Sequence, residues 1–176
     1  MTVADRVYES FKKYTESDYD NAAIQAFIAI DGTAKKVFKT GENKKRFTNL
    51  IKANLDLISK VIFLKDDIPE DEFINNKNLA SLLYDMRCSI LHEGVIGQVS
   101  WDKKRLAFEN GIYLVPNSLI IALIFVVIAQ PENIDENLEW GMHVEFFYKK
   151  RGIRFRFKEW IGDKNRIMNH FNHLYS

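Results

Sequence analysis

The run from Leu119 to Ala129 constrains the fold of this chain more than any other segment, because every residue in it is apolar. At about eleven residues, the run is well short of the ~20 residues that cross a bilayer. A helix that is apolar on all sides has to be buried on all sides. The run therefore predicts a central helix that the rest of the domain encloses, and no membrane partner.

The amino-acid composition limits the class of protein that contains this helix. The chain has 176 residues, of which 47% are hydrophobic, enough for one domain with a real core. Its 25 basic and 24 acidic residues leave a net charge of +1, so any nucleic-acid surface has to be a local patch. A single cysteine rules out an intramolecular disulfide, and the N-terminus lacks the layout of a signal peptide. We therefore expect a cytoplasmic protein.

Helical periodicity dominates the first half of the chain, and β-like runs enter in the second half. The spacing of apolar residues predicts helices near residues 3–14, 20–41, 42–64 and 78–94, with a polar loop over 65–78. The Asn110–Gly111 dipeptide predicts a hairpin within 95–116, because it suits a tight turn. A second pair of runs, 144–148 and 153–157, predicts another hairpin joined near Arg151–Gly152, followed by a helix at 164–174.

The fold class expected from this order is mainly α, a helical bundle with β-hairpin insertions in the second half. No Pro/Gly/Ser linker divides the chain, so we expect a single domain over 1–176. Its helical core would span 20–130 and carry the hairpin at 95–116, and the C-terminal hairpin and helix would occupy 140–176.

The segment 82–94 points most directly at chemistry. It has the pattern of a buried helix that carries Arg87, then His92, and that ends at Gly94. A permanently charged Arg can stabilise charge on phosphorus, and a His can move a proton, which together suffice to cleave RNA without a metal. Arg87 and His92 are the candidate catalytic residues. Five residues on an ideal helix correspond to a rotation of about 140°, so we expect the two side chains on different faces.

A second apolar face lies between them on the same helix. It consists of Ala80, Tyr84, Cys88 and Leu91. A helix that is apolar on two faces must bury both, so we expect this one to pack on the same helix of a second protomer. The sequence therefore predicts a homodimer. The alternative is structural: His92 caps the helix, and Arg87 is a surface charge paired with Asp85 or Glu93.

Two clusters of basic residues and one pair of histidines are weaker candidates for a binding site. Basic residues surround the last predicted hairpin, and we assign RNA binding to Lys150, Arg151, Arg154 and Arg156. The alternative is a solvated outer face over packed Phe155 and Phe157. The segment 44–46 (Lys-Lys-Arg) begins a helix, where cations are mildly unfavourable, so a phosphate contact there is a further hypothesis. His170 and His173 have no acidic or cysteine residues nearby to complete a zinc set. We expect no cofactor.

The segment from Leu83 to Gly94 resembles the signature of HEPN domains, in particular the ApeA-like branch, where an Arg-x4-His pattern ends the last core helix. Asn21–Phe27 is similar to the early helix of that family, and Lys45–Ile51 is similar to the segment that often opens its next helix. The resemblance covers about residues 20 to 130, and only the Arg-His segment is specific.

The resemblance implies a helical bundle that dimerises through the motif helices. Many members of the family are metal-independent endoribonucleases in bacterial defence or toxin–antitoxin systems, so it also implies an antitoxin or defence component as a protein partner. Carried over, Arg87 would stabilise the phosphate and His92 would transfer the proton. Cys88 departs from the polar residue that often follows the Arg in active members. The alternative function is therefore a non-catalytic dimerisation, docking or ligand-binding module.

Overall fold

The computed structural model describes residues 1–69, 78–93, 99–101, 104–138, 143–148 and 151–173, without the side chains of residues 92–93, 146–148 and 151–153. Its α-helices are α1 (Val3–Thr15), α2 (Tyr19–Val37), α3 (Asn43–Lys52), α4 (Leu55–Asp66), α6 (Leu79–Cys88), α7 (Ser118–Ile128) and α8 (Lys164–His173). Its strands are β1 (Val99–Ser100), β2 (Ala107–Glu109), β3 (Ile112–Leu114), β4 (His143–Tyr148) and β5 (Arg151–Arg156). The mainly helical fold class, with small hairpin sheets in the second half, is confirmed.

Helix α7 lies at the centre, and every one of its side chains is buried. It packs against α1, α2 and α4, and Phe125 stacks edge-on against Phe155 of β5 and Phe171 of α8. The predicted enclosed helix is therefore confirmed. None of the helices in the described part of the chain combines the length and the apolar character needed to span a membrane.

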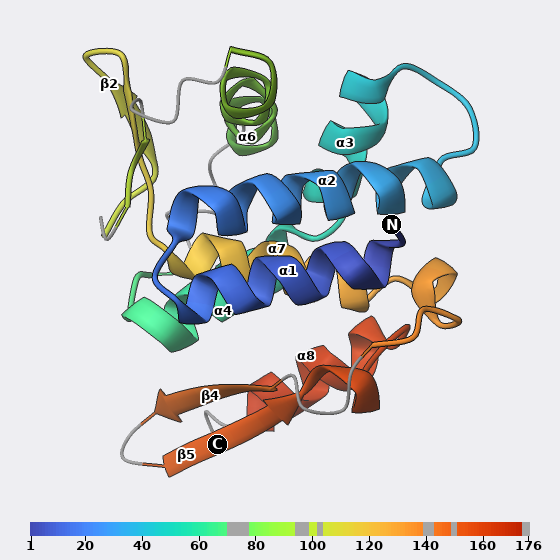
Figure 1. Cartoon of the computed structure of the whole chain (residues 1–176). Coiled ribbons are helices and arrows are strands. Elements are labelled where there is room, and N and C mark those ends of the chain that lie inside the picture. The colour runs from blue at the N-terminus through green and yellow to red at the C-terminus, as the bar shows by residue number, and fades with distance from the viewer. Residues whose placement is uncertain (70–77, 94–98, 102–103, 139–142, 149–150, 174–176) are drawn as a thin grey trace.

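The other elements form layers around α7 (Figure 1). In this view α6 and α3 lie above α2 and the sheet of β1–β3 stands to the left of α6, whereas the β4–β5 hairpin and α8 lie below α1 and α7. One cluster of buried apolar side chains runs through these layers, from Ala4 in α1 to Phe171 in α8. Helix α2 thus contacts both α7 and α3, and it connects the centre of the protein to the upper layer.

Helix α1 begins with a capping box. Thr2 caps it, since the backbone N–H of Asp5 donates to Thr2 Oγ1 at 3.1 Å and the N–H of Thr2 donates to the Asp5 carboxylate at 2.6 Å. These reciprocal bonds satisfy two N–H groups that a helix start leaves without partners. The direct contact with the Thr2 N–H also lowers the pKa of Asp5.

The prediction of one helix over 42–64 is wrong, because the chain breaks between α3 and α4 at Asn54. This side chain is only 2% exposed, and its Nδ2 donates to the carbonyl of Leu50 at 2.8 Å. Gln130, just after α7, donates to Asn54 Oδ1 at 3.3 Å. A buried Asn that bonds the backbone in this way competes with helix continuation, and its partner Gln130, 76 residues away, cannot be found from local periodicity.

The hairpin at Asn110–Gly111 is confirmed. Both residues have positive φ, 51° and 79°, as a two-residue turn of this type requires, and β2 pairs antiparallel with β3. The short strand β1, which pairs parallel with β3, is an addition to the prediction. In the second hairpin Tyr148 pairs with Arg151, so the predicted junction at Arg151–Gly152 is wrong and these residues belong to β5.

We predict that Phe125→Ala destabilises the protein by about 3–5 kcal/mol, because it removes a fully buried ring and leaves a cavity. Urea unfolding followed by circular dichroism measures this change. The control is Phe108→Ala, whose side chain is 53% exposed and should cost less than about 1 kcal/mol. Equal costs for the two variants would contradict the central position of α7.

Candidate functional site

The end of helix α6 is the candidate site. Leu79, Leu83 and Met86 are fully buried, which holds the helix in the upper layer and leaves Arg87 at the edge of the core. After Cys88 the chain continues as a π-helix, Ser89–Glu93. In a π-helix each N–H bonds the carbonyl five residues earlier, and such turns occur frequently at functional sites. This change of winding matters for the position of His92.

Residues five apart lie closer to one line along a π-helix than along an α-helix. The backbone of His92 belongs to the π-helix, whereas Arg87 belongs to α6. The rotation of about 140° expected for an ideal α-helix therefore does not describe the step between these two residues. The side chain of His92, like Gly94, lies outside the described part of the chain.

Arg87 is held by a residue from a distant part of the sequence. Its Nε donates to Asp31 Oδ2 in α2 at 3.0 Å, and its Nη2 donates to the same oxygen at 2.5 Å. The side chains are 12% and 27% exposed, so this ion pair is largely shielded from water. Burial alone would lower the pKa of Arg87, but the bonds to Asp31 and its charge outweigh burial and raise that pKa. Both bonds go to Asp31, and neither goes to Asp85 or Glu93, the two partners that the structural alternative predicted.

Tyr84 connects this ion pair to helix α3. Its ring lies edge-on to Phe47 of α3, with the centroids 5.6 Å apart. Arg87 Cζ is 5.8 Å and Lys44 Nζ is 5.4 Å from the centre of the Tyr84 ring, within the range of cation–π attraction. Burial, together with contact with the Cys88 thiol, raises the pKa of Tyr84. Two cations from different helices therefore share one aromatic ring.

The face predicted for dimerisation is used within the chain. Ala80 is 2% exposed and is therefore not available to a second protomer. Tyr84 is partly exposed, and its ring packs on Phe47 of α3. Cys88 and Leu91 are partly exposed. The assignment of Ala80 to a dimer interface is therefore wrong, because the sequence does not show that this residue is buried within the chain. The assignments of Tyr84, Cys88 and Leu91 stay predictions. Dimerisation itself stays a prediction.

The arginines of the C-terminal hairpin are paired with glutamates. Arg154 donates from Nε and Nη2 to Glu145 Oε1 at 3.1 and 3.0 Å, and Arg156 donates to Glu159 at 3.3 Å. The predicted alternation is present, since Arg154 and Arg156 are exposed while Phe155 is buried. Lys150 and the side chain of Arg151 lie outside the described residues. RNA binding at this hairpin stays a prediction, but its two described arginines each have a neutralising carboxylate.

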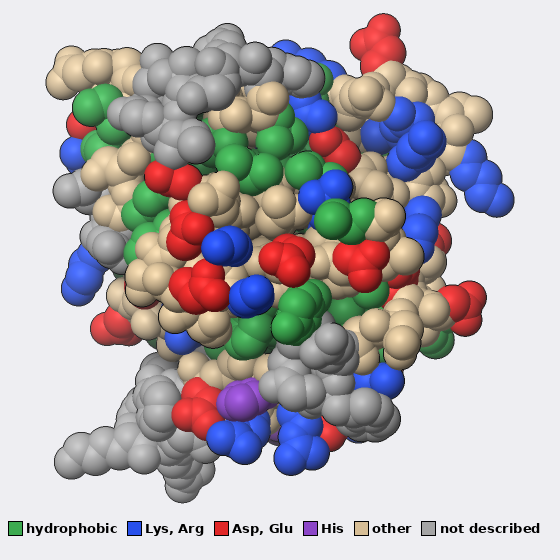
Figure 2. Space-filling model, in the orientation of Figure 1, with side chains coloured by type: hydrophobic (Ala, Val, Ile, Leu, Met, Phe, Trp, Pro, Cys, Tyr) green, Lys and Arg blue, Asp and Glu red, His purple; other side chains and the backbone are tan. Residues whose placement is uncertain are grey.

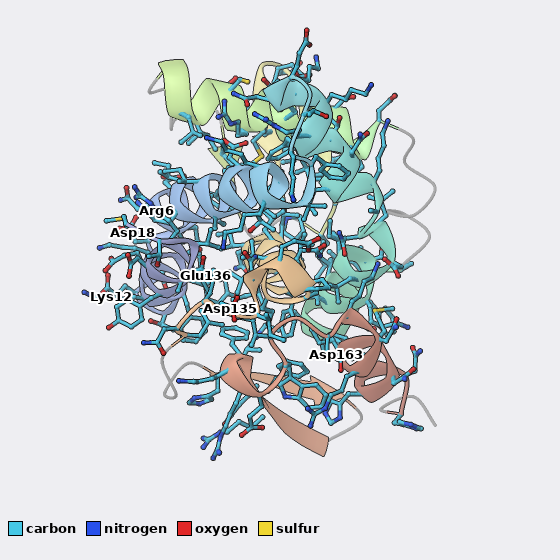
Figure 3. The ribbon with its side chains drawn as sticks, turned by 90° about the vertical axis from the view of Figure 1, so that its right-hand side faces the viewer. Arg6, Lys12, Asp18, Asp135, Glu136 and Asp163 are labelled. Atoms are coloured by element: carbon cyan, nitrogen blue, oxygen red, sulfur yellow. The ribbon has the colours of Figure 1, made fainter. Side chains whose placement is uncertain are left out.

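A hollow of about 530 Å³ beside the start of α1 is a feature that the sequence did not indicate. Its lining includes Asp5, Asp135 and Glu136, and Figure 3 shows the last two beside α1. Glu136 accepts bonds from Lys36 and from the backbone N–H of Ala4. Burial would raise the pKa of Glu136, but these bonds outweigh burial and lower it. The carboxylate thus has structural partners.

No group of three or more metal-ligating side chains exists among the described residues. His170 of α8 instead packs on aromatic rings, with its centroid 4.9 Å from that of Trp160 and 5.9 Å from that of Phe155. Burial, and then the charges of His173 and Arg166, lower the pKa of His170. This histidine therefore has the environment of a packing residue.

Comparison with known proteins assigns a family. The sequence model of a family described as Rv1289 matches residues 2–174, so the chain belongs to the Rv1289 family. No curated protein and no solved structure matched the chain.

The HEPN resemblance is therefore wrong, since the matched family is Rv1289 and covers nearly the whole chain. Only the segment 83–94 carried that resemblance specifically. An apolar helix that ends with cations and a glycine meets general requirements of helix termination, so such a segment recurs in unrelated proteins. The defence and toxin–antitoxin roles, and an antitoxin or defence partner, were implied by that resemblance and are not carried further.

We predict that Asp31 and Arg87 are coupled in stability. A double-mutant cycle with Asp31→Ala and Arg87→Ala should give a coupling energy of about 1–2 kcal/mol, because hydrogen bonds between charged, shielded groups exceed those at the surface. The matched control is Glu145→Ala with Arg154→Ala, which has the same two bonds to one oxygen but side chains 42% and 55% exposed. That pair should give less than about 0.5 kcal/mol. Equal coupling energies for both pairs would contradict the shielding of Arg87.

We predict a stability change with pH that depends on His170. Its pKa is lowered from 6.5 in the folded protein, so as the pH falls through that value the unfolded chain binds the proton first. The stability that His170 contributes is fully present above about pH 6.5. It decreases as the pH falls from there to the lowered pKa of the folded state, and it does not decrease further below that pKa. Urea unfolding at several pH values should show a smaller decline for His170→Gln than for the wild type. Parallel curves would refute this assignment.

Proposed function

We propose that this member of the Rv1289 family cleaves RNA without a metal ion, with Arg87 and His92 as the catalytic residues. The observation that supports this proposal is the way Arg87 is held. Two of its N–H groups bond one oxygen of Asp31, and the side chain is only 12% exposed, next to a π-helix that contains His92. A charged group fixed at the protein edge beside a proton-transfer residue suits stabilisation of a phosphorus-centred transition state.

The proposed reaction is an attack of the RNA 2′-oxygen on the adjacent phosphorus. The new bond joins the 2′-oxygen to phosphorus, and the bond from phosphorus to the 5′-oxygen breaks. The 2′-hydroxyl loses its proton, and the leaving 5′-oxygen gains one. His92 serves one of these two transfers, since an imidazole titrates near neutral pH, and Arg87 stabilises the negative charge that builds on the phosphoryl oxygens. The products are a 2′,3′-cyclic phosphate and a 5′-hydroxyl.

Asp31 acts in this scheme as a positioning residue. A long Arg side chain loses rotamer freedom when it binds a phosphate, which costs free energy at the moment of reaction. Because Asp31 and the Tyr84 ring already hold the guanidinium, part of that loss occurs on folding. The carboxylate also keeps the guanidinium charged in a site that is shielded from water, as the raised pKa of Arg87 reflects.

We predict that the wild type cleaves single-stranded RNA in the presence of EDTA and that Arg87→Lys lowers kcat at least about 100-fold. Lys retains the charge and can still pair with Asp31, so the variant should fold, but it lacks the planar fork that binds a phosphate by two bonds. His92→Ala should lower kcat by about 100-fold or more, the usual contribution of a proton-transfer residue. Gel analysis of end-labelled RNA measures the rate. The products are identified if their 3′ ends resist labelling until the cyclic phosphate has been opened and the resulting phosphate removed.

The matched controls are Arg105→Lys and His173→Ala, which change the same residue types: Arg105 is in an exposed ion pair with Glu109, and His173 ends α8. Both should cleave at the wild-type rate. The proposal fails if the wild type does not cleave RNA in EDTA, or if Arg87→Lys and His92→Ala cleave as fast as these controls.

A second candidate function, a non-catalytic docking module, is favoured by the tip of the β2–β3 hairpin. Phe108 and Ile112 are 53% and 40% exposed, and Phe108 stacks on Tyr113 with the centroids 4.6 Å apart. Exposed apolar side chains next to an edge strand are features of association surfaces. On this hypothesis a second copy of the chain binds the tip. Sedimentation equilibrium should then give a dimer for the wild type and a monomer for Phe108→Ser.

A further inference from the structure

The corner where α2 leads into α3 has an excess of positive charge. Between residues 35 and 46 there are six cations and one carboxylate, Glu42, in a chain whose total charge is only +1. Lys36 pairs with Glu136. The basic corner is defined here as the exposed lysines of this segment other than Lys36, namely Lys35, Lys39, Lys44 and Lys45. Figure 2 shows Lys and Arg side chains gathered at the upper right, over this connection.

The lysines of the basic corner lack the pairing found elsewhere on the surface. Among the described residues, none of the four is in an ion pair with a carboxylate, whereas Arg154 and Arg156 of the C-terminal hairpin each have one. Like charges that are close together and not neutralised repel one another, which costs stability. Such a cluster is compensated when a polyanion binds, and the bound cations then replace the counterions of that polyanion.

Helix α3 adds a second, independent indication of an anionic partner. Its first turn contains Lys44 and Lys45 and no acidic residue, although the positive end of the helix dipole disfavours cations there. The N-cap residue Glu42 makes no side-chain capping bond. The local sequence thus stabilises α3 less than an acidic first turn would, and an anion at this position would reverse that penalty.

The basic corner is also continuous with the candidate active site. Lys44 Nζ lies 5.4 Å from the centre of the Tyr84 ring, and Arg87 Cζ lies 5.8 Å from the same point. Proteins that bind single-stranded nucleic acid combine a row of cations with an aromatic ring beside it. Lys44, Tyr84 and the shielded Arg87 lie close enough together to form this combination.

We infer that the basic corner binds the phosphate backbone of single-stranded RNA and guides the strand to Arg87. This inference rests on the proposed function, and it names the surface that holds the substrate outside the reacting site. It places RNA binding at the α2–α3 connection and not at the C-terminal hairpin, where glutamates neutralise the described arginines.

The test uses a fluorescein-labelled RNA whose 2′-hydroxyls are methylated, so that it can bind but cannot be cleaved. Fluorescence anisotropy over a range of salt concentrations should show that Lys44→Gln/Lys45→Gln weakens binding at least about tenfold and lowers the salt slope by about 1.4, the value for two lost phosphate contacts on a single strand. The control Arg154→Gln/Arg156→Gln removes the same charge from the hairpin and should change the affinity less than about twofold. The thermal midpoint of Lys44→Gln/Lys45→Gln should equal or exceed that of the wild type, because the change removes cations from a helix start.

Failure of this inference can be told from failure of the proposed function. If Lys44→Gln/Lys45→Gln loses RNA binding but the wild type does not cleave RNA, the result supports RNA binding at the basic corner and contradicts the proposed cleavage. If the wild type cleaves RNA and Lys44→Gln/Lys45→Gln has an unchanged KM, the basic corner is overturned. It is also overturned if the hairpin control loses as much affinity, or if poly-glutamate of equal charge displaces the RNA as well as unlabelled RNA does, since the partner would then be an acidic protein.

Discussion

The complete burial of α7 is the constraint on which the rest of the structure depends. A helix without a polar side has to be covered over its whole circumference, and here α1, α2 and α4 cover it together with the aromatic rings of β5 and α8. Polar residues at its end fix the arrangement. The buried side chain of Asn133 donates to Thr33 of α2 at 2.9 Å and to the carbonyl of Val127 at 2.8 Å. Each of these groups would be costly to leave unpaired.

The candidate site follows from the position of α2. Its inner face packs against α7, and on the other side Asp31 reaches Arg87 at the end of α6. The same helix then leads through the basic corner into α3, whose Phe47 and Lys44 contact Tyr84. The site is therefore assembled from three helices, and the element that holds its central charge is also part of the core. The guanidinium is therefore held by an ion pair between two helices.

Local sequence patterns predict an element correctly where its conformation depends on residues that are close together in the chain. The apolar run at 119–129 and the Asn110–Gly111 turn both predicted their elements, because each depends on residues that are neighbours in the chain. The break at Asn54 was missed since it depends on burial against Gln130. The partner of Arg87 was missed for the same reason, as Asp31 is 56 residues away. No periodicity argument distinguishes a π-helix at Ser89–Glu93 from a continued α-helix, and the HEPN resemblance rested on this same short segment.

The most direct test of the central claim, that Arg87 and His92 bind one phosphate, is a nitrogen-15 NMR titration with a 2′-O-methylated dinucleotide. The Nε–H resonance of Arg87 and the imidazole resonances of His92 should both shift and saturate at the same dinucleotide concentration, while those of Arg154 and His173 stay in place. If Arg87 and His92 saturate at different concentrations, or if neither shifts while the dinucleotide binds elsewhere, the two residues do not form one site.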